Sequence, residues 1–220
     1  MSFSENLQKL HKEVPDKVKI VAVSKTKSEE TILEAYNTGH KIFGENRVQE
    51  LVRKYENLPG DIEWHMVGHL QTNKVKYIAG FVSLIHSVDS IKLLDTINKE
   101  AAKCNRIIDC LLQLRIAKEE TKFGLTYEEI RNILSSKELE EMKNVRITGL
   151  MGMATFTGDE NMISSEFNYL AKCFQQLKLS FYNSADYFKE LSMGMSNDYH
   201  LAVKAGTTMI RIGSILFGAR

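Results

Sequence analysis

The sequence predicts a small (β/α)8 barrel of eight short strands, with a helix after each of the first seven. Short runs rich in β-branched residues alternate with amphipathic helical runs along the chain, the pattern of parallel strands with helical crossovers. Eight strands favour a closed barrel. The competing open, doubly wound sheet usually carries a glycine-rich phosphate loop. Neither G-x-G-x-x-G nor G-x-x-x-x-G-K-[ST] occurs here, so the barrel is preferred.

The bulk composition bounds the class of protein. The 220 residues are 43% hydrophobic and 26% charged, which predicts one globular domain spanning residues 1–220. A net charge of +1 gives no reason to expect a nucleic-acid or membrane partner. The three cysteines are an odd number with no C-x-x-C spacing. Together with the lack of a signal-peptide pattern, they predict reduced thiols in the cytoplasm.

The first half of the chain opens with a helix and a buried strand. Ser2 and Glu5 have capping-box spacing and start a helix over 2–14. The apolar run VKIVAVS over 18–24 is typical of a strand buried on both faces. The elements expected next are helix 28–38, strand 41–44, helix 46–56, strand 62–67, helix 71–79, strand 82–86 and helix 90–104.

The second half continues the alternation. Thr126 and Glu129 form another capping box and start a helix that runs to about residue 135. Apolar residues between Phe167 and Leu177 give the clearest helical stripe in the chain. The other expected elements are a strand within 106–116, strand 145–150, strand 188–192, helix 198–204 and strand 209–212.

Lys25 is the most informative residue at the carboxyl ends of the strands, where parallel barrels carry their sites. It follows the first strand and shares its parity with Val21 and Val23. If these valines face the interior, so does the amine, and desolvation would lower its pKa and make it nucleophilic. The alternative is a lysine that extends into solvent, and position alone favours that alternative. Lys27 carries the same ambiguity.

The last two strand ends suggest a phosphate site. Ser196 follows the seventh strand, and Gly213 and Ser214 follow the eighth and open a short run that could form one helical turn. Barrel enzymes often bind phosphate at these two loops. A reactive lysine opposite such a cradle suggests a phosphorylated aldehyde, whereas Gly-Ser alone is equally a simple turn. Arg211, within the last strand, is either a donor to the ligand's ring or part of a structural ion pair.

Several segments resemble one family. They are residues 21–27 (VAVSKTK), 43–46 (FGEN) with 48–50 (VQE), 64–74 (WHMVGHLQTNK), 149–153 (GLMGM), 191–196 (LSMGMS) and 211–214 (RIGS) with 217–220 (FGAR). In this order, and over nearly the whole chain, they resemble the pyridoxal phosphate homeostasis proteins, relatives of the N-terminal barrel of alanine racemase. His69 departs mildly from the pattern of many relatives, and the loop 118–124 is variable.

The resemblance implies a fold, a cofactor and its contacts. It implies a single barrel of the alanine racemase N-terminal type, with pyridoxal 5′-phosphate (PLP) held covalently on Lys25 as an internal aldimine. Met153 and Met195 are candidates to flank the ring, although simple packing is the commoner use of methionine. The residues implied to contact the cofactor are Asn46 and His65 along it, Arg211 at the pyridine nitrogen, and Ser196, Gly213 and Ser214 at the phosphate. No metal is expected, because His65 and His69 lack the Glu of H-E-x-x-H.

The function implied is intracellular vitamin B6 homeostasis: storing, shielding or delivering PLP, with transient contact to PLP-dependent apoenzymes. An arginine at the ring nitrogen cannot accept a proton, which weakens the cofactor as an electron sink. Racemisation also needs a second acid–base group, which alanine racemases take from a separate β domain that we do not expect here. Tyr127 and Tyr199 are expected on helices or the surface. The alternatives are a low-activity amino-acid racemase or lyase, and a cofactor-free barrel enzyme of aldolase type.

Overall fold

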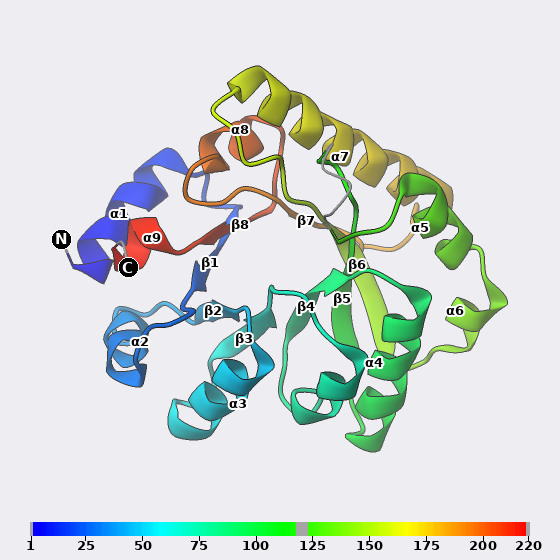
Figure 1. Ribbon diagram of the computed structural model, residues 1–220, viewed down its shortest axis with the longest axis horizontal. Helices are drawn as coiled ribbons and strands as arrows, with labels where there is room; N and C mark the ends of the chain where they lie inside the picture. Colours follow the sequence, from blue (N-terminus) through cyan, green and yellow to red (C-terminus); the bar gives the residue numbers. More distant parts are fainter. Residues whose placement is uncertain (1, 118–122, 219–220) are drawn as a thin grey trace.

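The computed structural model describes residues 2–117 and 123–218 and forms a closed barrel. Eight parallel strands follow one another in sequence order, and β8 returns to pair with β1. Figure 1 shows the strands at the centre and the helices around them. The predicted (β/α)8 fold is therefore confirmed. Most of the variable loop 118–124, and the end of the FGAR segment at Arg220, lie outside the described residues.

The strands are three to seven residues long. They are β1 (Lys19–Val23), β2 (Ile42–Glu45), β3 (Glu63–Met66), β4 (Leu84–Val88), β5 (Ile108–Gln113), β6 (Val145–Met151), β7 (Glu190–Ser192) and β8 (Met209–Ile212).

The helices cover the outside of the barrel. They are α1 (Phe3–Glu13), α2 (Glu29–Tyr36), α3 (Val48–Asn57), the 3-10 helix η1 (Thr72–Tyr77), α4 (Ile91–Lys103), α5 (Tyr127–Leu134), α6 (Lys137–Glu141), α7 (Glu160–Phe181), α8 (Tyr199–Lys204) and α9 (Ser214–Phe217). Both predicted capping boxes, Ser2 with Glu5 and Thr126 with Glu129, are present.

Two expected elements differ in the structure, and one helix is additional. The segment expected as helix 71–79 forms the shorter 3-10 helix η1. Strand β4 begins and ends two residues later than expected, so His86 lies in the middle of the strand instead of at its end. Helix α6 was not expected, and none of its residues is buried. Because it buries no apolar face, it leaves no periodic signal in the sequence.

Hydrophobic residues pack in two separate layers. The larger cluster joins the outer faces of the strands to the helices. A smaller cluster fills the barrel itself and contains Val21, Val67, Leu84, Leu111, Met151 and Met209. Successive strand residues point to opposite faces, so residues of one parity face the interior. Polar residues of that parity are therefore brought to the barrel axis or to one of its two mouths.

The barrel closes where the first and last strands meet. Lys19 pairs with Met209, and Val21 with Arg211. The terminal helices α1 and α9 lie side by side over this seam (Figure 1). The Asn6 side-chain amide donates a hydrogen bond to the Leu216 carbonyl at 3.1 Å. The loop that follows β8 is thus held by the beginning of the chain.

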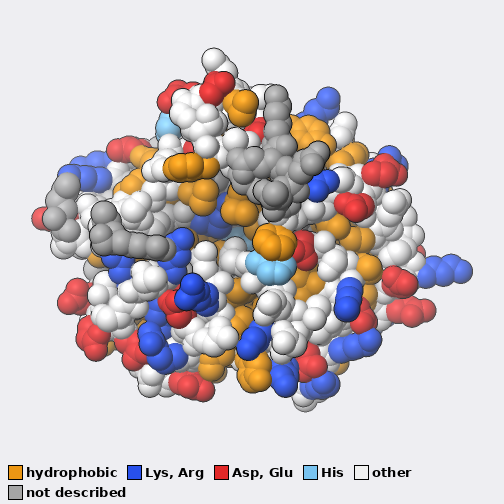
Figure 2. Space-filling model, in the orientation of Figure 1, with side chains coloured by type: hydrophobic (Ala, Val, Ile, Leu, Met, Phe, Trp, Pro, Cys, Tyr) orange, Lys and Arg blue, Asp and Glu red, His pale blue; other side chains and the backbone are white. Residues whose placement is uncertain are grey.

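Within the described ranges, no helix is long and apolar enough to cross a membrane, and no group of three potential metal ligands occurs. The prediction of no zinc site remains a prediction. On the face shown in Figure 2, acidic, basic and hydrophobic side chains are interspersed, and neither charge sign forms a continuous patch.

Candidate functional site

A cavity of about 710 Å³ opens at the carboxyl ends of the strands. We call it the C-terminal mouth, because its lining follows the ends of β1, β2, β6, β7 and β8. Seven of the eight predicted contact residues line it: Lys25, Asn46, Met153, Ser196, Arg211, Gly213 and Ser214. Residues far apart in the sequence therefore converge at the end of the barrel where the site was expected.

His65 is the exception, because it was predicted to lie beside these residues but does not line this cavity. The side chain is buried within β3 and lines a second cavity of about 340 Å³. We call this the N-terminal mouth, because its lining includes Lys19, Glu63 and Glu190, the first residues of their strands. At the C-terminal mouth, the β3 position is taken by Val67, two residues further along the chain.

Lys25 also departs from expectation in one respect. It lines the C-terminal mouth, but the residue is exposed instead of buried between strand interiors. The argument that desolvation activates its amine is therefore not supported by its position. What the structure provides instead is access: the lysine stands at the rim of a cavity that a small molecule can enter.

The loops after β7 and β8 line this cavity together with Lys25. The Gly213 backbone N–H donates to the Ser196 hydroxyl oxygen at 3.4 Å, which ties the two loops together. Ser214 then begins α9, confirming the predicted helical turn. The first N–H groups of a helix have no partners within it, so they are free to meet an anion. The Lys27 amine reaches the other end of α9 and donates to the Phe217 carbonyl at 3.1 Å.

Arg211 is buried at the base of the cavity with only neutral partners. Its guanidinium donates to the Ser192 hydroxyl at 2.6 Å and to the Gly152 carbonyl at 3.1 Å. No carboxylate among the described residues forms an ion pair with it. Burial lowers its pKa to about 10, and the charge of Asp198 opposes this shift. Of the two alternatives for Arg211, the structural ion pair is absent, and further N–H donors remain for a ligand.

A hydrogen-bonded chain runs from Arg211 through the barrel to His65. Ser192 Oγ lies 3.0 Å from His86 Nδ1, and His86 Nε2 lies 3.1 Å from His65 Nδ1. Because Ser192 accepts from the guanidinium, its own proton is best satisfied by donation to His86 Nδ1. His86 then donates from Nε2 to His65. This arrangement assigns the proton of His65 to Nε2.

Both histidines of this chain are held neutral by burial. Desolvation lowers the pKa of His65 from 6.5 to about 3, with a smaller effect from Lys19. Desolvation also lowers the pKa of His86 well below its usual value, and the nearby His65 and Arg211 add to the effect. A neutral imidazole both donates and accepts, which is what the directed chain requires.

Close backbone packing sets Asn46 at the rim. A Cβ atom on Gly68 would approach the Asn46 carbonyl oxygen to 2.4 Å, so only glycine lets the loops after β2 and β3 approach this closely.

Asp198 is a residue of the cavity lining that the sequence reasoning missed. It accepts the Met195 N–H at 2.6 Å. Burial raises the pKa of Asp198, partly offset by that N–H and by Arg211. Its position two residues after Ser196 was the available signal.

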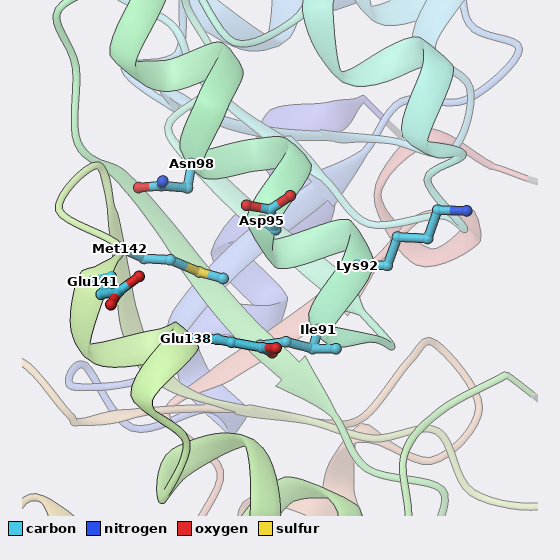
Figure 3. Close-up of a pocket in the computed structure, with 7 residues that line it drawn as sticks. All are labelled: Ile91, Lys92, Asp95, Asn98, Glu138, Glu141 and Met142. Atoms are coloured by element: carbon cyan, nitrogen blue, oxygen red, sulfur yellow. The ribbon is translucent and has the colours of Figure 1, made fainter.

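A third cavity lies outside the barrel and has a different character. Figure 3 shows it between α4 and α6, with Asp95 and Asn98 on one side and Glu138 and Glu141 on the other. Its volume is about 450 Å³. Asp95 already forms a surface ion pair with Lys99 at 2.6 Å. No strand end contributes to this cavity, so the C-terminal mouth remains the candidate site.

Comparisons with known proteins agree with the geometry. The family model for the alanine racemase N-terminal domain matches residues 1–220. A pyridoxal phosphate homeostasis protein from Aquifex aeolicus is 42% identical over 203 residues, covering 92% of this chain and 87% of that protein. The structure of PipY from Synechococcus elongatus with PLP bound has a TM-score of 0.88 and 34% identity, covering 99% of this chain and 100% of PipY.

A more distant likeness supports the fold alone. An alanine racemase from Clostridium difficile has a TM-score of 0.74 at 13% identity, and the match covers 100% of this chain and 56% of the racemase. The barrel topology, the family model over residues 1–220 and the identity to relatives over most of their length agree with one another. This chain belongs to the pyridoxal phosphate homeostasis protein family, within the group defined by the alanine racemase N-terminal domain.

Proposed function

We propose that this chain, as one domain over residues 1–220, binds PLP at the C-terminal mouth and acts in intracellular vitamin B6 homeostasis. The observation that carries the proposal is the convergence of Lys25 with Ser196, Gly213 and Ser214 around a cavity floored by Arg211. PLP is the ligand found in the structure of PipY, a relative of this chain.

The chemistry of the cavity suits the parts of PLP. The primary amine of Lys25 can condense with the aldehyde of PLP. This reaction forms a C=N bond and releases one water. Arg211 offers N–H donors to an unprotonated ring nitrogen. Ser196, Gly213 and Ser214 would hold the phosphate through hydroxyl and backbone N–H donors. Asn46 and Met153 would bound the ring, whereas we do not propose a direct contact for His65.

Storage and delivery follow from the exposure of Lys25. The bond to Lys25 occupies the aldehyde and so keeps it from reacting with other amines. Because the bond lies at an exposed rim, the cofactor can still be released to a PLP-dependent apoenzyme, which we propose as a transient partner. The three cysteines, Cys104, Cys110 and Cys173, are all free thiols. This suits a reducing compartment, and we propose that the protein acts in the cytoplasm.

The visible spectrum tests the proposal. After incubation with PLP and removal of excess, we expect a yellow protein whose colour is abolished by borohydride. Digestion and mass analysis should then place the reduced adduct on Lys25. A protein that stays colourless and retains no PLP would rule out the proposed cofactor and return attention to a cofactor-free barrel enzyme.

Catalysis is the second candidate, because three titratable side chains besides Arg211 border the cavity beside the proposed cofactor. They are Lys25, Lys27 and the buried Asp198. A weak racemase or lyase would use two of them on opposite faces of a substrate. Amino acids incubated with the PLP-loaded protein in D2O would then exchange their α-proton at a rate that depends on Asp198. Homeostasis alone predicts no exchange above the background of free PLP.

A further inference from the structure

A second lysine is buried beside the loop that carries Lys25. The Lys54 side chain on α3 is 0% exposed. Its amine donates to the Ser24 carbonyl at 2.8 Å and to the Glu45 carboxylate at 2.6 Å. Lysine is almost never fully buried unless it is paired, so this arrangement needs an explanation beyond packing.

Two carboxylates connect Lys54 to the residues on either side of Lys25. Glu45, at the end of β2, accepts from the Ser24 hydroxyl at 2.6 Å. Glu50, one helical turn before Lys54, lies 3.5 Å from its amine and accepts the Thr26 backbone N–H at 2.9 Å. We call Glu45, Glu50 and Lys54 the lysine clamp.

The backbone between these attachment points is tightly turned. The Ser24 carbonyl accepts a second hydrogen bond, from the Lys27 N–H at 3.0 Å. Thr26 has a φ of 65°, a left-handed conformation that is unfavourable for a β-branched residue. Strain of this kind persists only where the surroundings hold it, and the bond from Thr26 to Glu50 is such a restraint.

We propose that the lysine clamp positions Lys25 for covalent capture of the aldehyde. This inference rests on the proposed function. The clamp fixes both peptide groups that flank Lys25, so its long side chain starts from one defined point at the rim of the cavity. Lys54 is not itself a candidate nucleophile, because its amine is fully buried and does not line the C-terminal mouth. The clamp therefore consists of positioning residues, with Lys25 as the group they position.

The clamp also accounts for part of the sequence signature that the cofactor contacts leave unexplained. Glu45 belongs to the FGEN segment and Glu50 to the VQE segment, and neither lines the C-terminal mouth. In this structure the two carboxylates contact Ser24 and Thr26, the neighbours of Lys25, and not the cavity. Glu50 and Lys54 are four residues apart on α3, a spacing at which side chains on a helix are neighbours.

Substitutions of Glu50 give the sharpest test, because its side chain is 21% exposed and tolerates change better than buried Lys54. Glu50→Leu removes the acceptor for the Thr26 N–H, whereas Glu50→Gln keeps an acceptor oxygen there. We expect Glu50→Leu to slow covalent capture of PLP about tenfold or more, as misplacement of a reacting group does. Glu50→Gln should remain close to the unsubstituted protein.

Two measurements separate positioning from a general loss of structure. The first is the rate at which borohydride-trapped adduct accumulates on Lys25. The second is the dissociation constant for pyridoxamine 5′-phosphate, which carries the ring and phosphate but no aldehyde. Positioning predicts that Glu50→Leu changes the first and leaves the second within about twofold, a small free-energy difference. Lys54→Met with Glu45→Gln removes both charges together and should behave like Glu50→Leu if it folds.

The controls distinguish the possible failures. Lys99→Met removes an exposed lysine from its surface pair with Asp95 and should change neither measurement. If the unsubstituted protein forms no adduct, the proposed function fails before the clamp is examined. If it forms the adduct and Glu50→Leu captures PLP equally fast, the clamp does not position Lys25. Equal losses in capture and in pyridoxamine 5′-phosphate binding would also overturn the inference, since they would indicate a structural role only.

Discussion

The two mouths of the barrel are lined by similar residue types but use them differently. At the N-terminal mouth, charged groups pair with one another: Lys19 with Glu190 at 2.5 Å, and Arg146 with Asp109 at 2.7 Å. At the C-terminal mouth, Arg211 has only neutral partners, and Lys25 stands exposed at the rim. The difference teaches that charge content does not identify a site, whereas donors left without an opposite charge do.

The largest contrast is expected between two lysines of the same strand region. Lys19 begins β1 at one mouth, and Lys25 follows its end at the other. We expect Lys25→Ala to abolish the covalent adduct completely. Lys19→Ala should leave the adduct intact and change the free energy of unfolding by no more than about 1 kcal/mol, as for a partly exposed ion pair. Borohydride trapping and urea unfolding of both variants check this; adduct on Lys25→Ala would break the comparison.

A smaller effect is expected from acid, through the histidines between the mouths. Below pH 6.5 the unfolded chain protonates His65, whereas burial keeps it neutral in the native state down to about pH 3. The unfolded state then binds more protons, so stability falls as pH falls, by about 1.4 kcal/mol per pH unit for each such histidine.

Variant His65→Gln isolates this contribution in the protein without PLP. Glutamine retains an acceptor for His86 but cannot titrate, so the difference from the unsubstituted protein should show the slope of one histidine. His200→Gln, at an exposed site, is the control and should leave the slope unchanged. The measurement is the free energy of unfolding in urea between pH 4 and 7. Identical slopes in all three proteins would mean that His65 is not held neutral.

The smallest effects come from two buried hydroxyl groups. Ser192 accepts from Arg211 and bonds His86, whereas Thr148 Oγ1, at the N-terminal mouth, has no hydrogen-bond partner among the described residues. Ser192→Ala should cost about 1–3 kcal/mol, because it leaves buried groups unsatisfied, and Thr148→Val should be neutral or stabilising by up to about 1 kcal/mol. Thermal unfolding of both variants without PLP measures this. A destabilising Thr148→Val would show that the hydroxyl has a partner, such as a bound water.

The sequence predicted the barrel and most of its site for a clear physical reason. Alternating strands and helices require parallel pairing, and parallel pairing brings all strand ends of one kind to one mouth. Lys25, Ser196 and Gly213 follow strand ends, so their convergence was predictable from order alone. The role of each side chain toward PLP stays a prediction.

Depth along the barrel axis was not predictable in the same way. Side-chain alternation fixes the face on which His65 lies, but not which layer of the interior it occupies. A two-residue difference between His65 and Val67 separates one mouth from the other. Lys54 was missed for a related reason. A lysine on an amphipathic helix usually faces solvent, and its burial depends on Ser24 and Glu45, which lie in other elements.

The seam between β1 and β8 has a consequence for the order of events during synthesis. Lys25 leaves the ribosome well before Gly213 and Ser214, because β1 precedes β8 along the chain. Until β8 pairs with β1, a nascent chain has a reactive amine without the opposing loops, and two unpaired strand edges that are prone to association. A ligand held by the loops after both β1 and β8 favours only the closed form. PLP binding would therefore indicate that the barrel has closed.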